Sequence, residues 1–108
     1  DVFFRVVDEV DKLVKKKGWN LEKKINKNYV GFKMGFPNVF GIDWIGSKSF
    51  KFFFKVNHAL YNKIRKMCPY EMNYDERWKQ GTVRYSNNVD TKKLSKVFEV
   101  VYNAFVEK

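Results

Sequence analysis

The chain has 108 residues, of which 44% are hydrophobic and 19% aromatic, so it fits one folded domain and intrinsic disorder is excluded. Lys and Arg total 22 and Asp and Glu total 12, and the resulting net charge of +10 favours polyanionic partners. The single cysteine, Cys68, excludes an internal disulfide framework, and no apolar run reaches the ~18 residues that a membrane span needs.

An amphipathic helix is predicted over residues 2–17. Apolar side chains recur at helical spacing from Phe3 to Val14, and Lys15 to Lys17 lie in the last turn, where the helix dipole favours cations. Gly18 follows directly and suits the left-handed position that ends many helices.

After Gly18 the apolar periodicity changes to two, which predicts strands. Short breaks rich in Asn, Gly, Pro and Ser separate the alternating runs, so consecutive strands pair in an antiparallel meander. Four strands are predicted at residues 21–25, 29–34, 40–45 and 50–56, with turns at 26–28, 35–38 and 46–48.

The second half contains two further helices and one short strand. Asn57 is a suitable cap for a helix over 58–68, and Pro69 ends it. Residues 70–80 are predicted as an irregular loop, and Thr82 to Ser86 as a fifth strand. A last helix begins at Asp90 or Thr91 and carries an apolar stripe of Leu94, Val97, Phe98, Val101 and Phe105.

These elements predict a single α+β domain over residues 1–108. A four- to five-stranded antiparallel sheet packs against the N-terminal, middle and C-terminal helices, in the order α-β-β-β-β-α-β-α.

The sequence offers no pattern typical of a metal, cofactor or catalytic site. His58 and Cys68 are the only side chains of their kind, and zinc motifs are missing. Cys68 lies on an apolar stripe, so we expect a buried, inert thiol. The glycines match no phosphate-binding loop, and Gly31 and Gly41 within strands indicate close packing or a bulge.

A metal-dependent nuclease is one alternative. Glu22, Lys24 and Asp43 supply two carboxylates and a lysine, which such an enzyme needs close together around a cation. The opposing interpretation is that Glu22 and Asp43 pair with lysines on neighbouring strands.

A binding surface is the favoured interpretation. Strand alternation places aromatic and basic side chains together on the sheet face opposite the main apolar side. Rings stack on bases and cations neutralise phosphates, so this pattern predicts a non-enzymatic nucleic-acid-binding domain. The candidate residues are Tyr29, Lys33, Lys51, Phe53, Lys55 and Arg84 on the strands, with Trp78 and Lys79 from the loop before the fifth strand.

Other interpretations of the same residues stay open. A helix that covered this face would make Phe53 part of the core, Trp78 would serve only to anchor its loop, and evenly spread lysines would only solvate the surface. A protein-interaction or dimerisation module would instead use a sheet edge or the Phe-rich strand.

Several segments come in a familiar order: Tyr29 to Lys33, Phe50 to Val56, Trp78 to Val83, and the stripe from Leu94 to Phe105. This order resembles a small domain of unknown function called "predicted transport protein", often found in longer chains with nuclease-like modules. The resemblance covers residues 20–106. It implies an accessory module in nucleic-acid or defence systems and brings no catalytic residues.

The chain begins with Asp1 and shows neither an initiator Met nor a signal-peptide pattern. We therefore expect a domain excised from a longer chain. One free thiol without a disulfide is consistent with a reducing cytoplasm.

Overall fold

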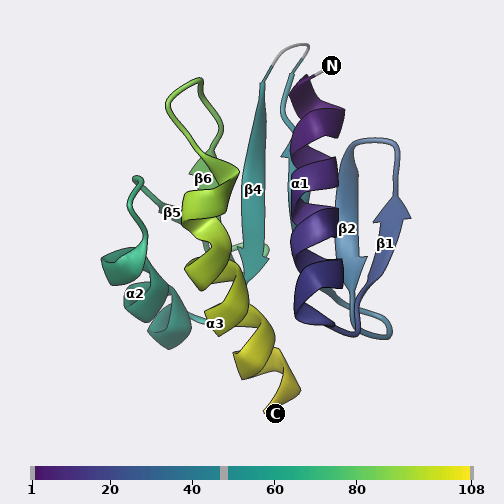
Figure 1. Ribbon diagram of the computed structural model, residues 1–108. Helices are drawn as coiled ribbons and strands as arrows, with labels where there is room; N and C mark the ends of the chain where they lie inside the picture. Colours follow the sequence, from purple (N-terminus) through teal and green to yellow (C-terminus); the bar gives the residue numbers. More distant parts are fainter. Residues whose placement is uncertain (1, 47–48, 108) are drawn as a thin grey trace.

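Six antiparallel strands form one sheet in the computed structural model, which describes residues 2–46 and 49–107 (Figure 1). The sheet order is β1-β2-β3-β4-β6-β5, so β1 and β5 form its edges. The predicted α+β class is confirmed. The elements are α1 Val2–Lys17, β1 Glu22–Ile25, β2 Tyr29–Lys33, β3 Asn38–Trp44, β4 Phe50–Lys55, α2 His58–Met67, β5 Asn73–Asp75, β6 Gln80–Arg84, the 3₁₀ helix η1 Thr91–Leu94, and α3 Ser95–Val106.

Helix α1 has the predicted bounds and ends as predicted. Gly18 has φ +68°, its N–H donates to the Lys15 carbonyl at 3.2 Å, and the Trp19 N–H donates to the Val14 carbonyl at 3.1 Å. This pair of bonds is a Schellman motif, which satisfies carbonyls that the helix itself leaves unpaired. It also directs the chain towards the sheet, where the Trp19 ring lies 6.1 Å from that of Phe40.

The core lies between the sheet and the helices. Phe98 of α3 is fully buried, and its ring lies 4.7 Å from Phe40 of β3 and 5.0 Å from Phe54 of β4. In another part of the core, the ring of Phe3 of α1 lies 4.6 Å from the Trp44 ring and 5.3 Å from the Phe50 ring. These rings stand edge to face, the arrangement that aromatic quadrupoles favour.

Helix α2 packs on the same side of the sheet as α1 and α3 (Figure 1). Asn57 caps it as predicted, because its side chain accepts the Leu60 N–H at 2.8 Å. A Cβ added to Gly81 of β6 would lie 3.2 Å from Tyr61 and 3.7 Å from Ile64, both on α2. The helices α1, α2 and α3 therefore share one side, and none of them covers the opposite face.

The loop predicted at 70–80 contains a strand, and that prediction was wrong. β5 pairs with β6, with Asn73 opposite Thr82 and Asp75 opposite Gln80. Three residues are too few to show an alternating pattern, so only pairing with β6 reveals the strand. β6 itself begins at Gln80, two residues earlier than predicted, and ends at Arg84.

A bulge changes the start of β3. Phe32 pairs with Phe40 but Lys33 pairs with Asn38, so Val39 is an extra residue between the two pairs. Val39 is fully buried and belongs to the core, although the predicted strand began only at Phe40. The bulge thereby places Asn38 beside Lys33 on the face away from the helices.

Three smaller predictions have different outcomes. Cys68 is half-buried where a buried thiol was expected; burial raises its thiol pKa, and a backbone hydrogen bond at Tyr70 partly offsets the rise. The predicted turn at 46–48 includes Ser47 and Lys48, which lie outside the described residues. Across residues 2–46 and 49–107, every helix is too short or too polar to cross a membrane.

An ion-pair cluster joins α1 to the edge strand. The Asp11 carboxylate is buried and lies 3.1 Å from Lys15 Nζ and 3.3 Å from Lys23 Nζ of β1. Burial raises the Asp11 pKa, but hydrogen bonds and charge from the two lysines outweigh it, so the net pKa is lowered. An Asp pKa below its unfolded value adds stability above that unfolded value, and the stability is lost as pH falls through the folded pKa.

We therefore predict that Asp11→Asn lowers the unfolding free energy at neutral pH and flattens its decline on acidification. Urea unfolding from neutral pH down to acid pH measures both effects. Asp8→Asn is the matched control, because the Asp8–Lys12 pair is exposed on both sides and surface pairs contribute little. Equal pH profiles for Asp11→Asn and the wild type would contradict the assignment.

Candidate functional site

The face of the sheet away from the helices, called here the open face, carries three rows of side chains that run across the strands. The first row is Tyr29, Asp43, Lys51 and Arg84, each opposite the next in the strand register. Tyr29, Asp43 and Lys51 are half-buried and Arg84 is exposed. Burial raises the pKa of the Asp43 carboxyl, and the charge of Lys51 partly offsets this rise.

The second row contains two paired glycines, which side chains cover. Gly31 lies opposite Gly41, and Gly41 lies opposite Phe53. A Cβ on Gly41 would collide with the Val30 carbonyl and lie 2.6 Å from the Phe53 ring. The ring therefore lies across the bare Gly41 backbone, which confirms the prediction that Gly41 marks close packing. Phe53 is only 6% exposed although it lies outside the main core.

The third row borders a hollow of about 610 Å³, within the ~300–1,000 Å³ range of small-ligand sites. Lys33 and Asn38 lie on one side of it, and Lys55 lies opposite Gln80 on the other. Phe53 and Tyr29 contribute rings 6.0 Å apart at its floor. The residues that line the hollow are Tyr29, Lys33, Phe36, Pro37, Asn38, Asp43, Phe53, Lys55, Trp78 and Gln80.

Two hairpin loops supply the exposed rings of the hollow. Trp78 comes from the loop between β5 and β6 and is 57% exposed, and Phe36 comes from the loop between β2 and β3 and is 92% exposed. The Arg77 guanidinium lies 5.1 Å from the Trp78 ring, and Lys33 Nζ lies 5.4 Å from the Phe36 ring. Each ring therefore has a cation beside it.

The backbone, rather than the ring, anchors Trp78. Its N–H donates to Asp75 Oδ1 at 3.1 Å, and its carbonyl accepts Lys55 Nζ at 2.9 Å. Lys79 follows at φ 52°, a left-handed conformation that closes the loop. The Trp78 side chain is thus exposed in its loop rather than packed beneath it.

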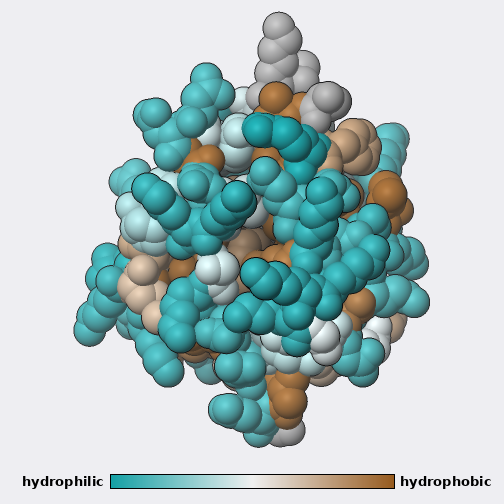
Figure 2. All heavy atoms as spheres, in the orientation of Figure 1, coloured by the Kyte–Doolittle hydropathy of each residue, from teal (hydrophilic) through white to brown (hydrophobic). Residues whose placement is uncertain are grey.

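Basic side chains occur on both sides of the molecule, so the open face does not hold all the positive charge. Figure 2 shows that the helix side is largely hydrophilic, with hydrophobic atoms only in small separate areas. Within the described ranges, however, ion pairs occur only on the helix side. They are Lys12–Asp8, Lys15–Asp11, Lys23–Asp11, Lys17–Glu99 and Lys96–Glu99. The open-face cations Lys33, Lys51, Lys55 and Arg84 thus lack a carboxylate ion-pair partner among those residues.

Strand alternation correctly placed most of the candidate residues. Tyr29, Lys33, Lys51, Phe53, Lys55 and Arg84 all lie on the open face, and no helix covers it. Lys79 is exposed in the loop beside Trp78 but does not line the hollow. The interpretation that assigned a helix to this face was wrong.

Phe36, Asn38 and Gln80 line the hollow but were not predicted. Phe36 had a usable signal: it stands between Gly35 and Pro37, and a ring within such a turn has little chance of burial. Asn38 depends on the bulge, and Gln80 on the early start of β6. The sequence shows neither feature.

The residues of the nuclease alternative do not meet. Glu22 lies opposite Lys33, while Asp43 lies opposite Tyr29, four residues away along β2. At a rise of ~3.3 Å per residue this separates the two carboxylates by ~13 Å along the strands, too far for them to ligate one cation. Among the described residues, no group of three or more His, Cys, Asp or Glu could hold a metal.

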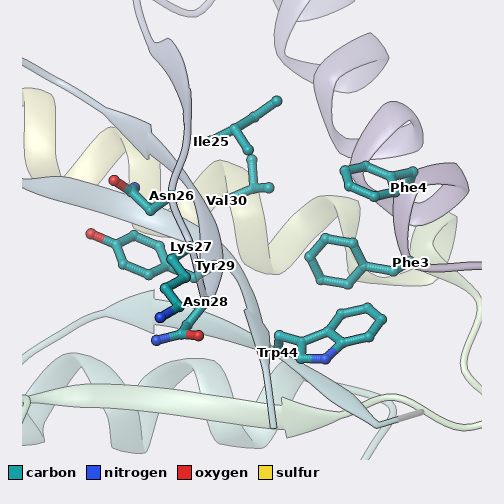
Figure 3. A pocket seen from close by; sticks show the side chains of 9 residues that line it. All are labelled: Phe3, Phe4, Ile25, Asn26, Lys27, Asn28, Tyr29, Val30 and Trp44. Carbon is teal, nitrogen blue, oxygen red and sulfur yellow. The ribbon is translucent and has the colours of Figure 1, made fainter. Parts of the chain in front are cut away.

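A second, smaller hollow of about 210 Å³ lies between the start of α1 and the β1–β2 hairpin. Figure 3 shows the rings of Phe3, Phe4 and Trp44 on one side and the side chains of Ile25 and Val30 on the other. Phe4 is 54% exposed and Ile25 is 63% exposed. Two exposed hydrophobic side chains, Phe4 and Ile25, therefore line this apolar cleft.

Comparisons with protein-family models, with curated proteins and with solved structures find no match. The resemblance to the "predicted transport protein" domain therefore stays a prediction, and function is inferred from the geometry of the open face.

The exposure of Trp78 predicts the fluorescence of the protein. Trp19 and Trp44 are half-buried, so Trp78 contributes most of the emission that acrylamide quenches readily. Trp78→Phe should remove that component, while Trp44→Phe should leave it in place. An unchanged quenching curve for Trp78→Phe would show that the ring is covered.

Proposed function

We propose that this domain is a non-enzymatic accessory module that binds nucleic acid through the open face. The observation that supports the proposal is made on the one side of the sheet that the helices leave uncovered. There, exposed rings accompany cations that form no ion pair within residues 2–46 and 49–107. Neither feature alone points to nucleic acid. Together they match its two repeating parts, the phosphate and the base.

The electrostatic part of the proposal rests on Lys33, Lys51, Lys55 and Arg84. Lys51 lies opposite Arg84 on the neighbouring strand, so two positive charges stand side by side. Like charges directly opposite are unfavourable in a sheet, and a bound phosphate would relieve the repulsion. Binding then releases counterions from the nucleic acid and weakens as salt rises.

The aromatic part rests on Tyr29, Trp78 and the buried Phe53. Trp78 presents most of its ring to solvent, whereas Phe53 is nearly covered and supports the floor of the hollow. Tyr29 is half-buried, so its exposure is intermediate between that of Trp78 and that of Phe53. Base stacking on an exposed ring contributes ~1–3 kcal/mol per base and tolerates any base sequence. We therefore expect the domain to show weak sequence preference.

We predict a strong salt dependence that involves particular lysines. Each phosphate contact contributes a slope in log K against log salt of about −0.7 on single strands and −0.9 on duplex DNA. Replacing Lys33 and Lys51 together by glutamine should reduce the slope by about 1.4 on single strands. Fluorescence anisotropy with labelled oligonucleotides at several salt concentrations measures it.

The matched control is Lys16→Gln with Lys93→Gln, which removes the same charge from exposed helix-side positions. The control should leave the slope nearly unchanged. Equal effects of the two double variants would assign binding to net charge rather than to the open face. No binding to any oligonucleotide at low salt would refute the proposed function.

A protein-interaction or dimerisation module remains the second candidate, and the apolar cleft of Figure 3 favours it. The edges of the sheet are poorly suited to pairing, because β1 exposes Lys23 and Lys24 and β5 has three residues. The cleft instead exposes Phe4 and Ile25 beside each other.

If this second candidate is correct and the partner is another copy, the mass from light scattering should rise with concentration. Ile25→Lys should then keep the protein monomeric, while Val106→Lys, at an exposed position on α3, should not. A monomer at every concentration would exclude self-association through the cleft and leave only a foreign partner.

A further inference from the structure

The two exposed rings that line the hollow lie on loops at its rim rather than on the sheet. Phe36 is 92% exposed and Trp78 is 57% exposed, and both line the hollow from hairpin loops that join different strands. In the described part of the chain, neither ring packs against another aromatic ring. Large apolar groups left in water in this way are typical of binding sites.

Hydrogen bonds to the backbone order both loops that carry these rings. Gly35, at φ +68°, allows the turn before Phe36, and the Met34 N–H donates to the Pro37 carbonyl at 3.1 Å across it. Trp78 is held by Asp75 and Lys55 as described above. A ring on an ordered turn loses little conformational entropy on binding, which favours affinity.

A cation accompanies each ring. Lys33 lies beside Phe36 and Arg77 beside Trp78, and Lys55 lines the hollow between the loops. Asp43 is the one carboxylate among the residues that line the hollow. The hollow therefore favours an anion that also has flat, apolar faces.

We propose that the ligand of this hollow is a single-stranded nucleic acid, with unpaired bases stacked on Phe36 and Trp78 and its phosphates beside Lys33 and Lys55. This inference rests on the proposed function and narrows its substrate class. In a duplex the faces of the bases are covered by their neighbours, so rings that project from loops have nothing to stack on.

The experiment compares labelled single-stranded oligonucleotides with blunt-ended duplexes of the same base composition. Wild-type protein should bind the single strand more tightly. Trp78→Ala and Phe36→Ala should each weaken single-strand binding about 5- to 150-fold, the loss expected for one stacked base. Duplex binding and the salt slope should stay unchanged, because the phosphate contacts remain.

Phe4→Ala is the matched control, since it removes an exposed ring from the helix side. Trp78→Phe is the second variant and should restore most of the affinity that Trp78→Ala loses. Far-UV circular dichroism and urea unfolding verify that each variant is folded, as expected when an exposed ring is removed.

The outcomes separate this inference from the proposed function. Binding of both forms with equal affinity, or full single-strand affinity in both alanine variants, would overturn the stacking inference and leave general nucleic-acid binding intact. Binding of neither form at low salt would refute both. A preference for the single strand that Trp78→Ala removes and Trp78→Phe restores would support both.

Discussion

Burial of one face of the sheet by α1 and α3 is the constraint from which the rest of the structure follows. Phe40 and Phe54 lie beneath Phe98, and each such ring contributes ~1.5–3 kcal/mol through burial. Side chains alternate along a strand, so a slip by one residue would move the whole apolar set into water. The same alternation commits Tyr29, Lys33, Lys51 and Phe53 to the opposite face. The composition of that face is thus tied to the stability of the core.

The open face has a shape as well as a composition, and two glycines are responsible. Gly31 and Gly41 lie opposite each other, and the Phe53 ring lies across the Gly41 backbone. An aromatic side chain on a bare sheet would ordinarily stand in water. Because Gly41 has no Cβ, the Phe53 ring packs against the backbone of the sheet, and it is buried without a covering helix. The result is an apolar floor between basic side chains, at the foot of two loops.

Charge alone does not distinguish the two sides of this molecule, because lysines occur on both. What differs is their pairing. On the helix side, Asp11 and Glu99 each hold two lysines, and the pKa of Asp11 is lowered despite its burial. On the open face, Asp43 lies beside Lys51 without a close ion pair, and burial raises its pKa. Cations that form no ion pair with a carboxylate in the described part of the chain, combined with exposed rings, make the open face the better candidate for an anionic ligand.

Periodicity in the sequence determined the bounds of α1, the four-strand meander and the side of the sheet on which each candidate strand residue lies, because these depend on local alternation and capping. The last helix was predicted to begin at Asp90 or Thr91, but Thr91–Leu94 forms the 3₁₀ helix η1 and α3 begins at Ser95. Gly18 and Asn57 marked their helix ends correctly, since each acts within a few residues of the chain. Tertiary structure alone decided the rest. β5 exists only because β6 pairs with it, and Asn38 reaches the open face only through the bulge at Val39. Phe36 and Trp78 border one hollow only because the folded sheet places both of their loops beside it. Contacts between segments distant in sequence leave no period in it, so no local pattern could have revealed them.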